Sequence, residues 1–155
     1  METILASKSP RRAKILSEHG WCFTVEPTEA AEVSIPRAPK RTVLVNAARK
    51  LKACRRIHPD AEIVAADTIV WFNGRIYGKP RDLEDAHRIL EMFSGKTHQV
   101  ITGIALMRAG EKPFCRQWSE ISEVTFKPLS CEIIDEYLKK VHVLDKAGAY
   151  AIQEC

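Results

Sequence analysis

The stretch from Glu62 to Trp71 constrains the fold of this chain more than any other part of its sequence. Ile63–Ala66 is an apolar run of strand length, Ile69–Phe72 is a second one, and Asp67 lies between them. A short apolar run bounded by turn residues is typical of a buried strand, and aspartate is rarely buried without a partner. At the tip of such a strand, Asp67 either forms a structural ion pair or takes part in chemistry.

The composition is that of an ordinary soluble globular domain, with 45% hydrophobic and 28% charged residues in a chain of 155. We therefore expect one domain with a core of its own. No apolar run approaches the roughly 18 residues of a membrane span. The N-terminus also lacks the basic and apolar regions of a signal peptide. We expect a cytoplasmic protein without a membrane partner.

Cysteines and net charge exclude further classes of protein. The five cysteines are scattered without a CxxC pair, which indicates reduced thiols rather than disulfides or a zinc site. The net charge of +4 is too small to indicate a nucleic acid as partner. The basic cluster between Arg49 and Arg56 lacks the interleaved aromatic residues that stack on bases.

The segment from Ile4 to Arg12 predicts a strand, a polar loop and then a helix with Ser9 as N-cap and Pro10 at its first position. On this helix we expect Ala13, Ile15 and Leu16 to face inward. Free N–H groups and the helix dipole make such a turn a ready anion site. The loop and the first turn add suitable hydroxyls and cations: Ser7, Ser9, Arg11 and Arg12. The alternative is a capped surface helix with a solvated basic face.

Acidic and basic candidates accompany Asp67 along the chain. Glu26, Glu29 and Glu32 lie in an irregular proline-containing segment, and one of them could share a divalent metal with Asp67. The pattern from Lys40 to Ile57 predicts a helix. Asn73-Gly74 is a strong hairpin signal that returns Lys79 toward Asp67. A simple cross-strand ion pair is the alternative for that lysine.

The remainder of the chain continues the alternation of helices and strands. We expect a helix from Asp82 to Phe93 and another from Ser130 to Lys140, each capped by its first residue. Between these helices we expect two strands, Thr97–Met107 and Trp118–Phe126. After a segment of small residues, Gln153 offers both a donor and an acceptor to a base edge.

Five short blocks distributed over nearly the whole chain carry a family resemblance. They are Leu5-Ala6-Ser7-x-Ser9-Pro10-Arg11-Arg12, Ala66-Asp67-Thr68-Ile69-Val70, Gly78-Lys79-Pro80, Ser94-Gly95-Lys96-Thr97-His98 and Asp145-Lys146-Ala147-Gly148-Ala149-Tyr150. In content and order they resemble the Maf family of nucleoside triphosphate pyrophosphatases. The resemblance implies an α/β fold like that of inosine triphosphate pyrophosphatases. In it, helices flank a central mixed sheet and two lobes enclose a nucleotide cleft.

The resemblance also implies an activity. Family members hydrolyse nucleoside triphosphates to the monophosphate and pyrophosphate with a divalent metal, Mg²⁺ or Mn²⁺. The pair Arg11-Arg12 resembles the branch that acts on dTTP and UTP, whereas an aromatic residue tends to replace Arg11 in the branch acting on 7-methyl-GTP. A nucleotide-binding regulator of cell division is a second alternative. A homodimer is an expectation at the level of the family.

The resemblance assigns roles by position in the motifs. Asp67 matches the catalytic proton acceptor, and Arg12, Thr68, Lys79 and Gln153 match positions that select the substrate. Lys50 matches a catalytic lysine of the preceding helix, with Lys52 as a competitor. Glu32 matches the metal-site glutamate, with Glu29 as the alternative. Ser7 and Ser9 match the phosphate loop, and we expect Lys50 and Lys79 to hold phosphates beside Asp67.

The chain departs from the family at its end. Ala151 stands where members often have glycine, and the sequence stops two residues after Gln153. Members usually continue with a further strand and a closing helix. We therefore expect core surface to be uncovered, at about 1.5–3 kcal/mol for each large apolar residue left exposed.

Overall fold

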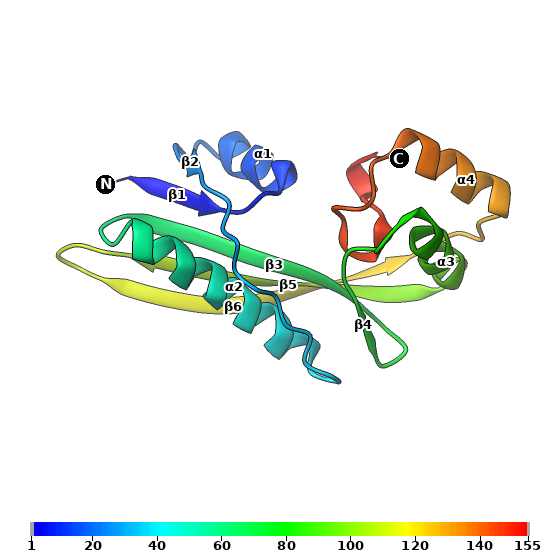
Figure 1. The fold of residues 1–155 in the computed structure, drawn as a ribbon, viewed down its shortest axis with the longest axis horizontal. Helices are drawn as coiled ribbons and strands as arrows, with labels where there is room; N and C mark the ends of the chain where they lie inside the picture. The colour runs from blue at the N-terminus through cyan, green and yellow to red at the C-terminus, as the bar shows by residue number, and fades with distance from the viewer. Residues whose placement is uncertain (1, 155) are drawn as a thin grey trace. The chain divides into compact units, whose positions relative to one another are not determined.

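The computed structural model describes residues 2–154 and contains one mixed sheet with helices beside it (Figure 1). The strands are β1 (Thr3–Ala6), β2 (Thr24–Val25), β3 (Glu62–Phe72), β4 (Arg75–Tyr77), β5 (Thr97–Arg108) and β6 (Phe114–Thr125). The α-helices are α1 (Pro10–Glu18), α2 (Pro39–Ile57), α3 (Leu83–Phe93) and α4 (Cys131–Lys140), and two short 3₁₀ turns, η1 (Ala147–Ala149) and η2 (Ile152–Glu154), follow. The expected α/β class with a mixed sheet is confirmed. The nucleotide cleft between two lobes stays a prediction.

The strand order is β2-β1-β3-β5-β6, and β4 pairs with β3. β1 runs parallel to both β2 and β3, whereas β3 and β4 form the antiparallel hairpin predicted from Asn73-Gly74. The register of β1 on β3 places Ala6 opposite Ala65. The loop that follows β1 therefore begins beside the residues that lead to Asp67.

One prediction about β3 was wrong. The two apolar runs belong to a single strand of 11 residues, so Asp67 lies within the strand and not at its tip. An aspartate tends to interrupt a strand because its side chain competes for backbone hydrogen bonds. Here side-chain donors satisfy both carboxylate oxygens of Asp67, so the ladder continues through it.

The chain forms two compact units, and the strands β3, β5 and β6 each contribute residues to both of them. The first contains residues 2–67 and 102–120 of the described part. Its core joins α2 to the strands β1, β3 and β5 through ten buried residues: Ile4, Ala6, Ala47, Leu51, Cys54, Ala61, Ile63, Ala65, Ala105 and Met107. Gly103 on β5 lets α2 come so close that a Cβ there would lie 2.5 Å from the carbonyl carbon of Val43.

Helix α1 differs from its prediction in two respects. Ser9 occupies the N-cap position, but its side chain makes no capping hydrogen bond. Ile15 is 52% exposed, and no residue of α1 is fully buried. The helix therefore lies on its unit with a half-buried face that includes Ala13 and Leu16 but leaves Ile15 in solvent.

The second unit contains residues 68–101 and 121–154 of the described part. α3 and α4 pack around a core that includes Phe72, Phe93 and Ile134. Both predicted caps are confirmed, because Asp82 accepts from the N–H of Asp85 and Ser130 accepts from that of Ile133. β6 begins at Phe114, four residues before the predicted start at Trp118. Most of its side chains are exposed, so the sequence there lacks the alternation of apolar residues that marks a half-buried strand.

Among the described residues, no helix combines the length and the apolar character needed to cross a bilayer.

Candidate active site

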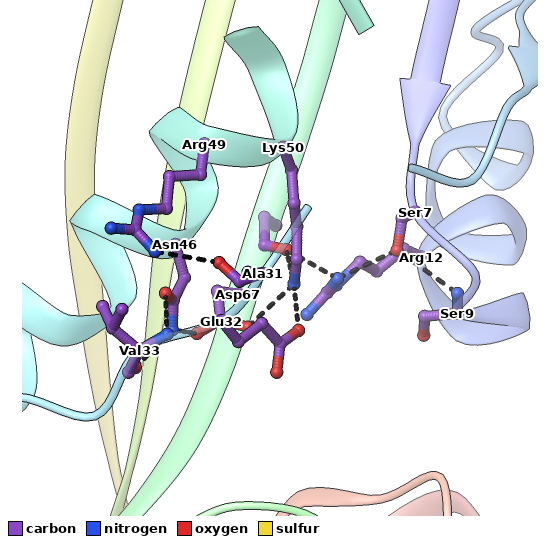
Figure 2. Close-up of polar contacts among 11 residues, drawn as sticks. Ser7, Ser9, Arg12, Ala31, Glu32, Val33, Asn46, Arg49, Lys50 and Asp67 are labelled. Carbon is purple, nitrogen blue, oxygen red and sulfur yellow. Dashed lines mark hydrogen bonds and ion pairs between the residues drawn. The ribbon is translucent and has the colours of Figure 1, made fainter. Parts of the chain in front are cut away.

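Asp67 is a buried carboxylate whose two oxygens have different partners (Figure 2). Its side chain is 7% exposed. Nζ of Lys50 lies 2.9 Å from Oδ1, and Nδ2 of Asn46 lies 2.9 Å from Oδ2. These two partners supply the hydrogen bonds and the opposite charge that a buried carboxylate requires. The geometry therefore presents an oriented, negatively charged group.

Both partners of Asp67 come from one face of α2. Asn46 and Lys50 are four residues apart, so their side chains lie one above the other along the helix. Close packing of α2 at Gly103 sets the helix against the sheet that carries Asp67. The position of the helix thus decides where both donors meet the carboxylate.

Lys50 joins a second carboxylate to the site. Its Nζ lies 2.8 Å from Oε1 of Glu32, and its side chain is only 14% exposed. Glu32 belongs to the irregular segment before α2 and remains about half exposed. The ammonium of Lys50 therefore reduces the repulsion between the carboxylates of Glu32 and Asp67 and holds both beside it.

Arg12 supplies a second cation beside β3. Its Nη1 donates to Oγ of Ser7 and to the carbonyl oxygen of Ala66, each at 2.9 Å. Nζ of Lys50 lies 3.3 Å from the same carbonyl, so Arg12 and Lys50 converge on Ala66. Burial lowers the pKa of the Arg12 guanidinium, and the negative charge of Asp67 acts in the opposite direction. An arginine remains charged despite such a shift.

The loop between β1 and α1 is organised by Ser7 rather than by Ser9. Oγ of the buried Ser7 accepts from the backbone N–H of Ser9 at 3.2 Å and from Arg12. Ser9 itself is half-buried and makes no capping hydrogen bond. The first turn of α1 contains no acidic residue, so the positive end of its dipole is not neutralised from within the helix.

Two alternatives left open by the sequence differ clearly in the structure. Glu32 contacts Lys50, whereas Glu29 pairs with Lys8 at the surface and is 88% exposed. Lys50 reaches Asp67, whereas Lys52 is exposed on another side of α2. The first member of each pair is the one that belongs to the Asp67 site.

The other candidates are found on the second compact unit and on α1. Thr68, Lys79 and Gln153 belong to the second unit, so their relation to Asp67 stays a prediction. The register of the hairpin ends with Tyr77 opposite Val70, two residues before the exposed Lys79. Gln153 is exposed within η2, and Arg11 is half-buried on α1.

Sequence reasoning did not identify Asn46. The residue is 2% exposed and contacts Asp67 directly. A polar residue among Val43, Ala47 and Leu51 on the buried face of a helix was the available signal, because buried amides need partners.

A metal site would have to be built on two carboxylates. Within residues 2–154, no group of three or more histidine, cysteine, aspartate or glutamate side chains converges as a metal centre. Glu32 and Asp67 are nevertheless brought together through Lys50. Mg²⁺ is commonly held by one or two carboxylates and takes its other ligands from water and substrate phosphates. This donor set fits such an ion.

Replacement of Lys50 by methionine tests the link between the two carboxylates. We expect Lys50→Met to lower kcat by about 100-fold, because a positioned charge is lost from the site. Steady-state rates at a fixed pH provide the measurement. Lys52→Met is the matched control, and an equal loss in both variants would contradict the role of Lys50.

The comparisons with a family model and with known proteins agree on one family. The model of the Maf family, described as Maf-like protein, matches residues 2–155. The dTTP/UTP pyrophosphatase of Phocaeicola vulgatus is 45% identical over 154 residues, covering 97% of this chain and 78% of that relative. The protein of the same name from Akkermansia muciniphila is 41% identical over 155 residues, covering 97% and 79%.

Solved structures agree at the level of the fold. A HAM1 protein from Coxiella burnetii has a TM-score of 0.51 and 16% identity, covering 79% of this chain and 71% of that chain. The Ham1 protein of Staphylococcus aureus has the same TM-score and 14% identity, with coverage of 81% and 72%.

Proposed function

Because this chain belongs to the Maf family, we propose that it hydrolyses nucleoside triphosphates, above all dTTP and UTP, to the monophosphate and pyrophosphate. The names of the relatives from Phocaeicola vulgatus and Akkermansia muciniphila support this choice of substrates. The observation that carries the proposal is the buried Asp67 carboxylate, held by Lys50 and Asn46 and accompanied by Arg12.

In the proposed reaction, Asp67 acts on water. Its carboxylate orients a water molecule and accepts a proton from it as the oxygen attacks the α-phosphorus. The new P–O bond forms as the bond to the bridging oxygen breaks, and pyrophosphate departs with that oxygen. The fixed position of both carboxylate oxygens favours this role, because a base must be oriented before the reaction.

Charge on the triphosphate is opposed by groups around Asp67. Arg12 and Lys50 contribute two cations, and the N-terminus of α1 contributes backbone N–H groups. Ser7 holds Arg12 in place by accepting its hydrogen bond. Arrayed donors of this kind stabilise charge that develops during phosphoryl transfer.

A divalent cation completes the proposal. Glu32 and Asp67 would hold Mg²⁺ or Mn²⁺, and water and phosphate oxygens would supply the other ligands. When bound, the ion neutralises phosphate charge and polarises the P–O bonds. Lys50 contacts both carboxylates, so it must share them with that ion.

Substrate selection is assigned to residues outside the Asp67 cluster. We assign Thr68, Lys79 and Gln153 to recognition of the pyrimidine and its phosphates, with Arg11 and Ser9 at the phosphate loop. A site that hydrogen-bonds a base edge discriminates strongly, because a wrong base leaves buried polar groups without partners. The proposal places the enzyme in the cytoplasm, as a homodimer, with free nucleotides as its substrates.

The test is release of pyrophosphate from dTTP, UTP, CTP, 7-methyl-GTP and ITP with Mg²⁺ or Mn²⁺. We expect selective cleavage of dTTP and UTP, and no cleavage in EDTA. Preference for 7-methyl-GTP would support the other branch of the family. Nucleotide binding by a folded protein without release of pyrophosphate would overturn the enzymatic proposal in favour of a regulatory role. Circular dichroism on the same sample establishes that the protein is folded.

A further inference from the structure

Asn46 uses its whole carboxamide at the junction of Asp67 and the segment that carries Glu32. Nδ2 donates to Oδ2 of Asp67 and to the carbonyl oxygen of Val33, each at 2.9 Å, and Oδ1 accepts from the N–H of Val33 at 2.8 Å. Both amide hydrogens and the amide oxygen are therefore engaged. Figure 2 shows Asn46 between Asp67 and Val33.

These contacts allow only one orientation of the amide. A flipped Asn46 would turn its oxygen toward the carboxylate of Asp67 and its NH₂ group toward the N–H of Val33. Both contacts would then be repulsive. Because Asn46 is 2% exposed, water cannot replace the lost partners, and a buried polar group without a partner is costly. The amide thus has a defined donor aimed at Asp67.

We propose that Asn46 is a positioning residue that fixes Asp67 and the backbone next to Glu32 relative to each other. Val33 follows Glu32 directly, so the clamp on its N–H and carbonyl groups also holds the chain that presents the second carboxylate. Lys50 connects the two carboxylates by charge, whereas Asn46 connects the carboxylate of Asp67 to the backbone of Val33 by directed hydrogen bonds. This inference rests on the proposed pyrophosphatase function for its kinetic part only.

Thr42 provides a matched control on the same helix. It lies one turn before Asn46, and its Oγ1 accepts from the N–H of Ile35 at 3.0 Å and lies within 3.4 Å of the carbonyl oxygen of Ile35. It is equally buried, with 1% exposure, and binds the same irregular segment. The side chain of Thr42 differs from that of Asn46 because its described hydrogen bonds do not include Asp67.

The experiment compares Asn46→Leu, Asn46→Asp and Thr42→Val with the unchanged protein. We expect Asn46→Leu to lower kcat for dTTP by about 10- to 100-fold with a smaller change in KM, because a hydrogen bond to a charged group is lost. Thr42→Val should lower stability and leave kcat nearly unchanged, because its described hydrogen bonds do not include Asp67.

A second measurement does not depend on turnover. In protein with ¹³C-labelled aspartate carboxyl groups, the resonance of Asp67 is identified by its absence from Asp67→Asn. At a fixed neutral pH, its chemical shift should move in Asn46→Leu, because the carboxylate loses a hydrogen-bond donor, and remain in place in Thr42→Val. If Asn46→Leu does not fold, Asn46→Asp keeps the shape of the amide and also removes the donor, so it should move the same resonance.

The outcomes separate the two proposals. An Asp67 chemical shift that is the same in the Asn46 variants and in the unchanged protein overturns the positioning role, as does an equal displacement in Thr42→Val. Absence of pyrophosphate release from the unchanged protein defeats the proposed function instead, and the chemical shift of Asp67 still decides the role of Asn46.

Discussion

Replacement of Asp67 by asparagine should lower kcat for dTTP by about 100- to 10,000-fold, the range that general-base catalysis contributes. The substitution keeps the shape of the side chain but removes its charge and its capacity to accept a proton. It also sets an NH₂ group against Lys50 or Asn46, both of which donate to the carboxylate. Pyrophosphate release at saturating nucleotide measures kcat, and its dependence on dTTP concentration gives KM.

The control for this variant is Asp60→Asn, an exposed aspartate in the turn that precedes β3. It removes the same charge from the same region of the chain, so long-range electrostatics changes in the same direction. Asp60→Asn should retain nearly full activity. If Asp67→Asn retained the turnover of the unchanged protein, Asp67 would not be the base, and the remaining catalysis would have to come from charge stabilisation alone.

Gly103→Ala should destabilise the first unit by about 1–3 kcal/mol, the usual cost of overpacking a core. An added Cβ would lie 2.5 Å from the carbonyl carbon of Val43, 2.6 Å from its oxygen and 2.8 Å from the nitrogen of Leu44. These atoms belong to the backbone of α2, so a rotamer change cannot relieve the clash. Urea unfolding followed by circular dichroism measures the loss, as a lower midpoint at constant slope.

The same change should also reduce activity in the protein that remains folded. Displacement of α2 moves Asn46 and Lys50, whose donors meet Asp67 at hydrogen-bond distance. Gly78→Ala is the matched control for stability, because a Cβ there has no neighbour within 4 Å. A Gly103→Ala protein as stable as Gly78→Ala would show that α2 and β5 are not in close contact.

Local patterns in the sequence predicted most of the regular elements. Asn73-Gly74 predicted the β3–β4 hairpin, and Asp82 and Ser130 predicted helix starts that the structure confirms. Such features depend on residues close in sequence, whose turn and capping preferences act before any tertiary contact. The exposed face of β6 carried no such pattern, and its start at Phe114 was missed.

The sequence by itself determined that Asp67 is a carboxylate in an apolar stretch and that cations precede it. Only the tertiary structure decided which partners reach it. Asn46 is hydrogen-bonded to Asp67, which lies 21 positions later in the sequence, and Arg12 to Ala66, which lies 54 positions later. In the same way, the tertiary structure brings Glu32 and Asp67 into contact with Lys50, whereas Glu29 pairs with Lys8 at the surface. The physical reason is that helix α2 has one buried face, and its contact with Gly103 fixes which side chains on that face lie against Asp67.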